Sequence, residues 1–368
     1  METLLLPINC NEKISFCLTQ ISGVVSGGGR LCVRFVHNVF IKNGGQMKSA
    51  LVLGGSGFIG HHMVRRLKQE GFWVRAVDIK YPAFSEIEAD DFLLGDLSDI
   101  LVCEAAVDRK FDEIYQFAAD MGGAGYIFTG ENDSAIMQNS ALINLNILRA
   151  CSRRNSKNIF YSSSACIYPT ENQQDPDTPN CRENSAYPAN PDSEYGWEKL
   201  FSERLYLAHA KNDNFRVRIG RYHNIFGAEG AWVGGREKAP AAICRKVAAA
   251  PSNGEIEIWG DGQQTRSFLH IDECIDGTLG VMRSQHQGPF NIGSDEMVTI
   301  NQLVSIVAKV ANKFIQPVHI PGPLGVRGRN SDNEHIFKMV GWRPSETLRA
   351  GIERTYPWIE HQLLSYNR

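Results

Sequence analysis

The stretch Ala50-Leu51-Val52-Leu53-Gly54-Gly55-Ser56-Gly57-Phe58-Ile59-Gly60 joins a short apolar run to a turn of closely spaced glycines. The apolar run is typical of a buried strand, and apolar residues at helical spacing follow the turn as far as Gly71. A second apolar run, from Trp73 to Val77, ends at Asp78. Strand, glycine turn, helix, strand and terminal acid occur in the order of a dinucleotide-binding unit.

The chemistry of this unit explains its residue types. Glycines let the backbone approach a pyrophosphate, which lies at the N-terminus of the helix that follows. A carboxylate about 20 residues further on binds the ribose 2′-hydroxyl and repels a 2′-phosphate. The sequence therefore predicts NAD rather than NADP as the cofactor. The residues predicted to bind it here are Gly54, Gly57, Phe58, Ile59, Gly60 and Asp78.

Strand-like and helix-like segments continue to alternate beyond this unit, which predicts a Rossmann-type, doubly wound parallel sheet of the α/β class. Further strands are expected at 92–94, 113–119, 158–163 and 216–220, and a helix at 134–151. The alternation weakens after Gly220, where a helix at 239–250 and a strand at 255–259 indicate a smaller, interleaved α+β domain. The predicted domains are 47–220 with about 262–287, which would bind NAD, and 221–261 with about 288–368, which would bind substrate.

Composition excludes several classes of protein. The 368 residues carry a net charge of −3, which gives no basis for nucleic-acid binding. No apolar run approaches the roughly 18 residues of a membrane span. Nine scattered cysteines without a Cys-x-x-Cys pair indicate free thiols in a cytoplasmic protein. The histidines are not at metal-ligand spacing, so no metal is predicted.

Residues 1–46 differ from the rest because they show no sustained periodicity. They are interpreted as a flexible or cleaved leader, or as the result of a start assigned too early, with Met47 as the true first residue. The second reading is favoured.

A second group of chemically active residues lies between Tyr161 and Lys199. Ser164 and Cys166 follow the strand expected at 158–163, and Tyr195 and Lys199 are four residues apart. On a helix, Tyr195 and Lys199 share one face, so the ammonium is expected to lower the pKa of the phenol. A hydroxyl, a phenol, a lysine and a thiol together can move protons and support hydride transfer.

These motifs give the chain a family resemblance. The glycine turn, Tyr195-x-x-x-Lys199 and the segment 259–268 (Trp-Gly-Asp-Gly-Gln-Gln-Thr-Arg-Ser-Phe) resemble the extended short-chain dehydrogenase/reductases that act on nucleotide sugars. Within that group, four blocks resemble the GDP-mannose 3,5-epimerase family. They are 118–123, 163–169, 234–242 and 325–332, and the resemblance begins near Met47.

The resemblance implies an NAD-dependent isomerase that oxidises the hexose at C4, epimerises C3 and C5, and reduces C4 again to yield GDP-L-galactose and/or GDP-L-gulose. Tyr195 would be the base of the redox step, Lys199 its electrostatic partner and Ser164 a hydrogen-bonding helper. Cys166 and Lys238 would form the acid/base pair for epimerisation. A homodimer is also implied.

The resemblance further assigns binding residues. Asp96 would contact the adenine side of NAD. The residues that would contact the nucleotide sugar are Gly122, Gly123, Ser164, Ala165, Cys166, Asn224, Glu237, Lys238, Ala239, Lys246, Arg266 and Arg327.

Alternatives remain open at this stage. A nucleotide-sugar 4-epimerase would need no second acid/base pair, and a 4,6-dehydratase would need acidic residues where this chain has Ala165 and Cys166. A catalytically silent NAD-binding regulator is an alternative of another class. Segments 126–132 and 173–182 depart from the family pattern, which leaves the hexose and the choice between 5- and 3,5-epimerisation open.

Overall fold

The structure is a computed structural model that describes residues 47–322 and 325–366. Residues from Met47 onward form one compact unit. The predicted leader, residues 1–46, lies outside the described residues.

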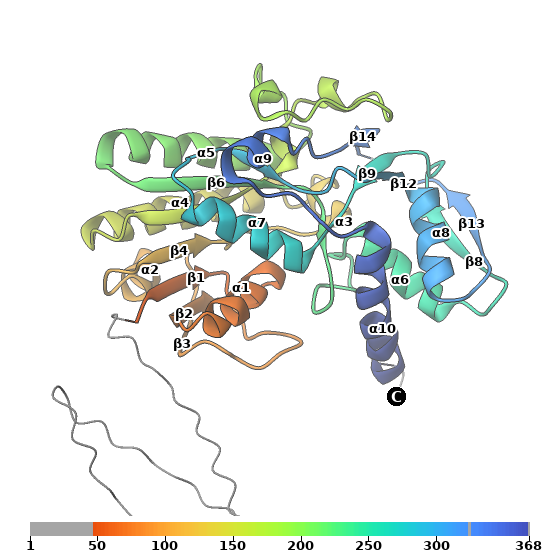
Figure 1. The fold of residues 1–368 in the computed structure, drawn as a ribbon, viewed down its shortest axis with the longest axis horizontal. Helices are drawn as coiled ribbons and strands as arrows, with labels where there is room; N and C mark the ends of the chain where they lie inside the picture. The colour runs from red at the N-terminus through yellow and green to blue at the C-terminus, as the bar shows by residue number, and fades with distance from the viewer. Residues whose placement is uncertain (1–46, 323–324, 367–368) are drawn as a thin grey trace, which may run out of the picture. The chain divides into compact units, whose positions relative to one another are not determined.

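A seven-stranded sheet organises this unit, with the strand order β11-β6-β5-β4-β1-β2-β3 (Figure 1). Every neighbouring pair in it is parallel. The predicted fold class, a Rossmann-type parallel sheet, is confirmed. The strands are β1 (Ser49–Leu53), β2 (Trp73–Asp78), β3 (Asp91–Leu94), β4 (Glu113–Gln116), β5 (Asn158–Ser164), β6 (Arg216–Tyr222) and β11 (Phe290–Ile292).

Two strands of this sheet differ from the sequence prediction by more than two residues. Strand β4 ends at Gln116 rather than at residue 119, and the chain leaves the sheet through Phe117 and Ala118. Strand β11 was not predicted because its three residues are too few to show a period. It pairs with β6, although the predicted division assigns it to the smaller domain. The domain boundaries themselves stay a prediction.

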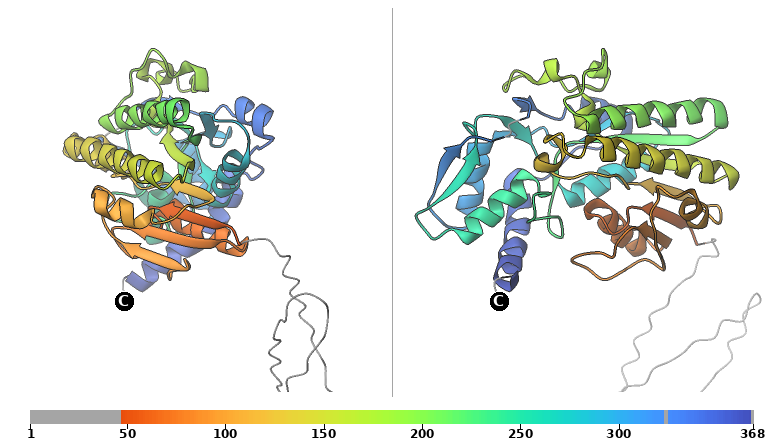
Figure 2. Two further views of the ribbon diagram at one scale, coloured as in Figure 1. Left: turned by 90° about the vertical axis from the view of Figure 1, so that its left-hand side faces the viewer. Right: turned by 180° about the vertical axis from the view of Figure 1, so that it is seen from behind.

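Helices cover both faces of the sheet, as the two turned views also show (Figure 2). Alternate side chains of β1 point to opposite faces, since Ala50 and Val52 belong to one core cluster, and Leu51 and Leu53 to another. The first cluster includes residues of α1 (Phe58–Gln69) and α7 (Ile271–Arg283). The second includes residues of α2 (Ile100–Ala106), α4 (Asp133–Arg153) and α5 (Glu194–Asp213).

A third core cluster lies among helices α6 (Ala239–Ala249), α8 (Ile300–Val310) and α10 (Leu348–Tyr366). Strand β8 (Gly254–Trp259) contributes Ile256 and Ile258 and pairs with β13 (Ile315–Ile320). The predicted helix and strand of this region are therefore present. The short elements are α3 (Ala124–Ile127), η1 (Ala165–Ile167), η2 (Thr170–Gln173), η3 (Glu183–Ala186), β7 (Ile225–Phe226), β9 (Thr265–Ser267), β10 (Leu269–His270), β12 (Met297–Thr299), β14 (Gly328–Arg329) and α9 (Glu334–Val340).

Among the described helices, none combines the length and the apolar character required to cross a bilayer.

Candidate active site

The glycine-rich turn between β1 and α1 is closely packed. Gly54 has a φ of +77°, and its N–H donates to the Val77 carbonyl oxygen at 2.8 Å. A Cβ at Gly60 would overlap the Gly54 carbonyl oxygen, so α1 approaches the turn only because position 60 is glycine. Gly57 precedes α1 as its N-cap, and Phe58 and Ile59 open the helix.

The two predicted acidic residues lie at the carboxyl ends of neighbouring strands. The Asp78 carboxylate, at the end of β2, accepts from the backbone N–H of Ser56 at 3.0 Å and of Lys80 at 3.3 Å. Burial raises the pKa of Asp78, and these hydrogen bonds oppose the rise. Asp96 follows β3, is exposed and accepts from the Ser98 N–H at 2.8 Å.

These residues fit a dinucleotide. The cradle at Gly54 and Gly60 leaves no room for side chains, the Ser56 hydroxyl is buried without a hydrogen-bond partner, and the Asp78 carboxylate is bound to the backbone of the same turn. Gly54, Gly57, Gly60 and Asp78 would thus hold NAD.

Tyr195 and Lys199 lie in the first turns of α5, beside the end of β5. Both side chains are buried, and Lys199 Nζ is 5.7 Å from the centre of the Tyr195 ring. Lys199 Nζ donates to the Ser162 carbonyl oxygen at 2.9 Å, which anchors the ammonium under β5. Burial lowers the pKa of Lys199. The Tyr195 phenol also interacts with the Ser164 hydroxyl.

The predicted lowering of the Tyr195 pKa is wrong for the chain alone. Burial raises the pKa of Tyr195, and the interaction with Ser164 only partly opposes it. The spacing of Tyr195 and Lys199 correctly predicts a shared face, but it carries no information on desolvation. In this site desolvation makes the largest contribution to the pKa of Tyr195.

Cys166 lies in the 3₁₀ turn η1, directly after β5. Its backbone N–H donates to the Ser164 hydroxyl at 3.1 Å, which caps the turn and holds Ala165 buried between the two residues. The Cys166 thiol is half-buried and packs against the cluster around Tyr195. It also accepts from Arg329, a buried residue that sequence reasoning did not assign to the site.

Lys238 approaches the same place from the N-cap of α6. Its ammonium donates to the Gly122 carbonyl oxygen at 3.3 Å. Burial lowers the pKa of Lys238, while the Cys166 charge raises it and Arg329 lowers it further. The structure thus brings together Cys166 and Lys238, which are 72 residues apart by their sequence numbers (238 − 166).

Glycines set the distance between the loop after β4 and the segment before α6. A Cβ at Gly123 would lie 2.6 Å from the Glu237 carbonyl oxygen, and one at Gly122 would lie 2.6 Å from the Tyr126 side chain. The Glu237 carboxylate accepts from Arg245 through one oxygen at 3.2 Å, while its other oxygen is buried without a partner. That oxygen is a free acceptor next to Lys238 and Ala239.

Two further predicted sugar-binding residues lie nearby. Asn224 has a φ of +47° and donates through its amide to the Ser267 carbonyl oxygen at 2.9 Å. Arg266, in β9, donates to the Val326 carbonyl oxygen at 2.7 Å. Burial lowers the pKa of Arg266 to about 10, and Arg329 contributes to this shift.

Two cations that are predicted to contact the nucleotide sugar lie around β8. Lys246 donates to the Glu257 carbonyl oxygen at 2.6 Å, and burial lowers its pKa. Arg327 makes two hydrogen bonds to the Asp261 carboxylate, at 3.1 and 3.2 Å. An exposed pair such as Arg327 and Asp261 is screened by solvent and binds weakly, so an anionic ligand can replace the carboxylate.

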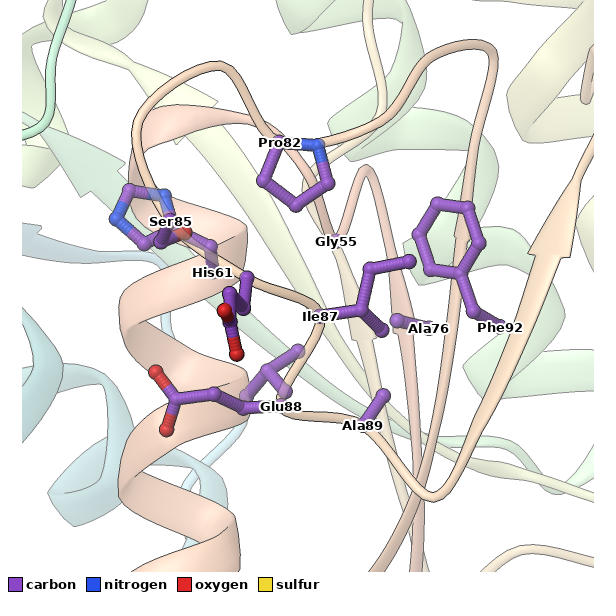
Figure 3. Close-up of a pocket in the computed structure, with 11 residues that line it drawn as sticks. Gly55, His61, Ala76, Pro82, Ser85, Ile87, Glu88, Ala89 and Phe92 are labelled. Atoms are coloured by element: carbon purple, nitrogen blue, oxygen red, sulfur yellow. The ribbon is translucent and has the colours of Figure 1, made fainter.

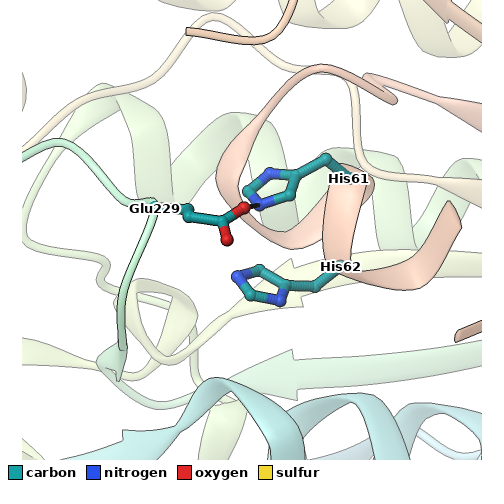
Figure 4. Close-up of side chains that lie close together, drawn as sticks. All are labelled: His61, His62 and Glu229. Carbon is teal, nitrogen blue, oxygen red and sulfur yellow. Dashed lines mark ion pairs between the residues drawn. The ribbon is translucent and has the colours of Figure 1, made fainter. Parts of the chain in front are cut away.

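One group of possible metal ligands involves residues that the sequence spacing did not connect. His61 and His62 lie on α1, as predicted, and ligand atoms of His61, His62 and Glu229 lie within 4.8 Å of one another (Figure 4). Glu229 is already bound, however, by His61 at 2.8 Å and by Arg65 at 3.0 Å. Burial lowers the pKa of His62 to about 4. The ion pair between Arg65 and Glu229 connects α1 to the loop after β7.

Two cavities lie apart from the Cys166 region. One, of about 10 Å³, lies between Gly55, His61 and the segment 82–89, and has room for about one water molecule (Figure 3). The other, of about 800 Å³, is a largely polar groove lined by segments 178–184 and 330–334. Neither is lined by Cys166 or Tyr195.

The parallel sheet with its dinucleotide turn, and the tyrosine and lysine beside it, define an NAD-dependent enzyme of the short-chain dehydrogenase/reductase type. Residues 50–293 match the model of the NAD dependent epimerase/dehydratase family, and the chain belongs to this family. The predicted cofactor and the predicted class of enzyme are confirmed.

Comparison with individual proteins narrows the similarity to one group within this family. The chain is 45% identical over 314 residues to GDP-mannose 3,5-epimerase of Arabidopsis thaliana, covering 85% of this chain and 82% of that protein. It is 44% identical, with the same coverage, to GDP-mannose 3,5-epimerase 1 of Oryza sativa subsp. indica. These comparisons confirm the resemblance predicted from the sequence.

Solved structures share the fold. UDP-glucose 4-epimerase of Thermotoga maritima, in complex with UDP-glucose, is similar with a TM-score of 0.74 and 22% identity, covering 86% of this chain and 99% of that one. The UDP-glucose 4-epimerase of Thermus thermophilus, in complex with NAD, gives a TM-score of 0.71 at 22% identity, covering 84% of this chain and 98% of that one.

Proposed function

We propose that the chain epimerises GDP-mannose at C3 and C5 to GDP-L-galactose and/or GDP-L-gulose. One observation carries the proposal: the Tyr195 and Lys199 pair lies beside a thiol and a lysine, Cys166 and Lys238, that come from different elements. A 4-epimerase needs only the first pair. The 45% identity to a protein named GDP-mannose 3,5-epimerase supports the same substrate.

The first stage is oxidation at C4. NAD, bound by Gly54, Gly57, Gly60 and Asp78, supplies the acceptor for the C4 hydride and later the donor that returns it. Tyr195 accepts the proton of the C4 hydroxyl, and the hydroxyl of Ser164 orients the Tyr195 phenol. Lys199, anchored on the Ser162 carbonyl oxygen, stabilises the phenolate.

The second stage inverts the neighbouring carbons. A ketone at C4 acidifies the protons on C3 and C5, so groups of moderate basicity can remove them. Inversion requires that one group remove the proton from one face of the ring and a second group return one to the other face. Cys166 and Lys238 are suited to this because they reach the site from η1 and from the start of α6. Tyr195 finally returns its proton to the C4 oxygen.

The other predicted site residues bind the two ends of the substrate. Arg327, Lys246 and Arg266 bind the diphosphate side, and Glu237, Asn224, Ala239 and the Gly122–Gly123 turn contact the sugar. The chain works in the cytoplasm as a homodimer, with the NAD-binding and substrate-binding domains divided as predicted. Light scattering that finds a monomer at micromolar concentration would refute the dimer.

The decisive experiment follows solvent deuterium. GDP-mannose is incubated with the protein in deuterated water, and the C3 and C5 protons are followed by NMR. Exchange at both carbons with new L-hexose signals is expected. Exchange at neither carbon, in protein that retains NAD, would refute the proposal and leave the 4-epimerase or the regulator.

The Cys166→Ala variant separates the two stages. It should lose C5 exchange and still bind NAD, because Cys166 is not part of the cofactor cradle. Unchanged exchange would remove Cys166 from the mechanism.

A further inference from the structure

All three nitrogen positions of the Arg329 guanidinium are bound by the chain itself. Nη1 donates to the Cys166 thiol sulfur at 3.1 Å, Nη2 donates to the Asp192 carboxylate at 2.9 Å, and Nε donates to the Gln173 side-chain oxygen. Arg329 is only 6% exposed. The buried Arg329 guanidinium thus binds one thiol, that of Cys166, and has one buried carboxylate, that of Asp192, as its counter-ion.

The groups around Arg329 fix its orientation. Gln173 donates through its amide nitrogen to the carbonyl oxygens of Tyr168 and Pro169, at 3.0 and 3.2 Å, so its oxygen must face Arg329. The backbone is fixed by the pairing of β14 with β9. A Cβ at Gly328 would lie 2.5 Å from the Asp175 carbonyl oxygen, so the strand packs closely against the segment after η2. This is one of the segments that depart from the family pattern.

Arg329 differs in this respect from Arg327, two residues earlier. The Arg327 side chain is 33% exposed, and its only charged partner among the described residues is the exposed Asp261. Arg327 can therefore exchange its partner for a phosphate. Arg329 cannot do so without leaving Asp192 and the Cys166 sulfur unpaired in a buried site.

We infer that Arg329 is a positioning residue that holds Cys166 as the thiolate which takes the proton from the sugar. The inference rests on the function proposed above. A thiolate accepts a guanidinium hydrogen bond far better than a thiol does, and a neighbouring arginine stabilises the thiolate. Lys238, which reaches the site from the start of α6, then returns the proton.

Other charged groups lie around Arg329 and Cys166 and also influence their charge states. Burial disfavours the Arg329 charge, but Cys166 and Asp192 raise the pKa of Arg329 above its ordinary value. The titratable or charged groups that interact with Arg329 or Cys166 are Asp192, Cys181, Arg266, Lys238, Tyr195, Lys199 and His223.

Alkylation of Cys166 by iodoacetamide tests the inference without any substrate. The rate is measured from pH 5 to pH 9 in the NAD-loaded protein, and Cys166 is identified by mass spectrometry of its peptide. In Arg329→Met the pH of half-maximal rate should rise, so that the rate at pH 7 falls about tenfold or more. Arg329→Lys should restore much of the loss.

The Asp192→Asn variant should act in the opposite direction. It removes the carboxylate that competes for Arg329, so Cys166 should react faster than in the unmodified protein at pH 6. A purely structural disturbance would not shift the profile upward in one variant and downward in the other. This variant also tests the inference if Arg329→Met fails to fold.

The matched control is Arg182→Met. Arg182 forms an ion pair with Asp332 at 2.9 Å but is 65% exposed, and its profile should equal that of the unmodified protein. Identical profiles in Arg329→Met and the unmodified protein would refute the role of Arg329. If the alkylation profiles of the Arg329 and Asp192 variants shift as expected but the unmodified protein exchanges no deuterium into GDP-mannose, the proposed function is refuted and the role of Arg329 is not.

Discussion

The pKa values of individual side chains in this site depend more on burial than on the residues near them in sequence. The i, i+4 spacing of Tyr195 and Lys199 correctly predicts that they share a face of α5, yet the pKa of Tyr195 is raised by burial. The pKa of Lys238 is lowered for the same reason, because desolvation disfavours the ammonium. Burial thus moves the pKa of the Lys238 amine toward neutral pH, where an acid gives up its proton readily, and moves the pKa of the Tyr195 phenol away from it.

Removal of the Tyr195 hydroxyl tests its role as the base. In Tyr195→Phe the rate of C4 oxidation should fall by about 10²–10⁴-fold, because general base catalysis is lost. Bound NADH formation in rapid mixing with GDP-mannose measures this step. The NAD content and the circular dichroism spectrum should remain unchanged, and a loss smaller than about threefold would contradict the assignment.

The pH dependence of inversion tests Lys238. Lys238 must be protonated to return a proton, and burial lowers its pKa from the ordinary lysine value. As pH rises, the ammonium is therefore lost before an ordinary lysine would titrate. The fraction of deuterium-exchanged hexose that is also inverted should fall as pH rises, and should be near zero at every pH in Lys238→Met. A fraction that does not change with pH would exclude Lys238 as the acid.

At the scale of elements, the site depends on close contacts between segments that the sequence does not connect. Gly123 allows the loop after β4 to touch the backbone before α6, and this contact places Lys238 on the Gly122 carbonyl oxygen. The buried pair of Glu203 on α5 and Arg221 on β6, at 2.8 Å, fixes the helix that carries Tyr195 against the sheet. Ser163 of β5 also donates to Glu203.

A methyl group at position 123 should disturb the placement of Lys238. We expect Gly123→Ala to destabilise the fold by about 1–3 kcal/mol through overpacking. Epimerisation should fall by about 100-fold, because a displacement of about 1 Å has that effect on a catalytic group. The control is Gly125→Ala, whose Cβ would lie 3.5 Å from the nearest atom. Equal effects of the two variants on deuterium exchange would contradict this account.

The buried ion pair should matter for stability. Glu203→Gln leaves the Arg221 charge buried without its counter-ion, and we expect a loss of about 3–5 kcal/mol in the free energy of unfolding. Urea denaturation measures it. The exposed pair of Arg349 and Glu353 provides the control, since Glu353→Gln should cost less than about 0.5 kcal/mol.

At the scale of the whole molecule, cofactor binding should stabilise the folded chain selectively. Protein stripped of NAD should regain about 2.7 kcal/mol of stability when NAD is added at about 100 times its dissociation constant. NADP at the same concentration should give little shift in Tm, because the Asp78 carboxylate would repel its 2′-phosphate. Asp78→Asn should reduce the difference between the two cofactors, and equal shifts in the unmodified protein would contradict the role of Asp78.

Much of the architecture was predictable because its signals are local. The glycines from Gly54 to Gly60, the acid at Asp78 and six of the seven parallel strands follow from short-range patterns of polarity and turn chemistry. Strand β11 was missed because three residues show no period, and its pairing with β6 is a long-range contact.

The sequence by itself determined the class of protein, since the dinucleotide turn and the Tyr195 and Lys199 spacing are contiguous features. Tertiary structure decided which groups surround the Cys166 thiol. Arg329, Asp192 and Gln173 come from separate parts of the chain and meet at Cys166 only after folding. Burial and the direction of a hydrogen bond depend on how these distant segments pack together, so no pattern of neighbouring residues in the sequence predicts them.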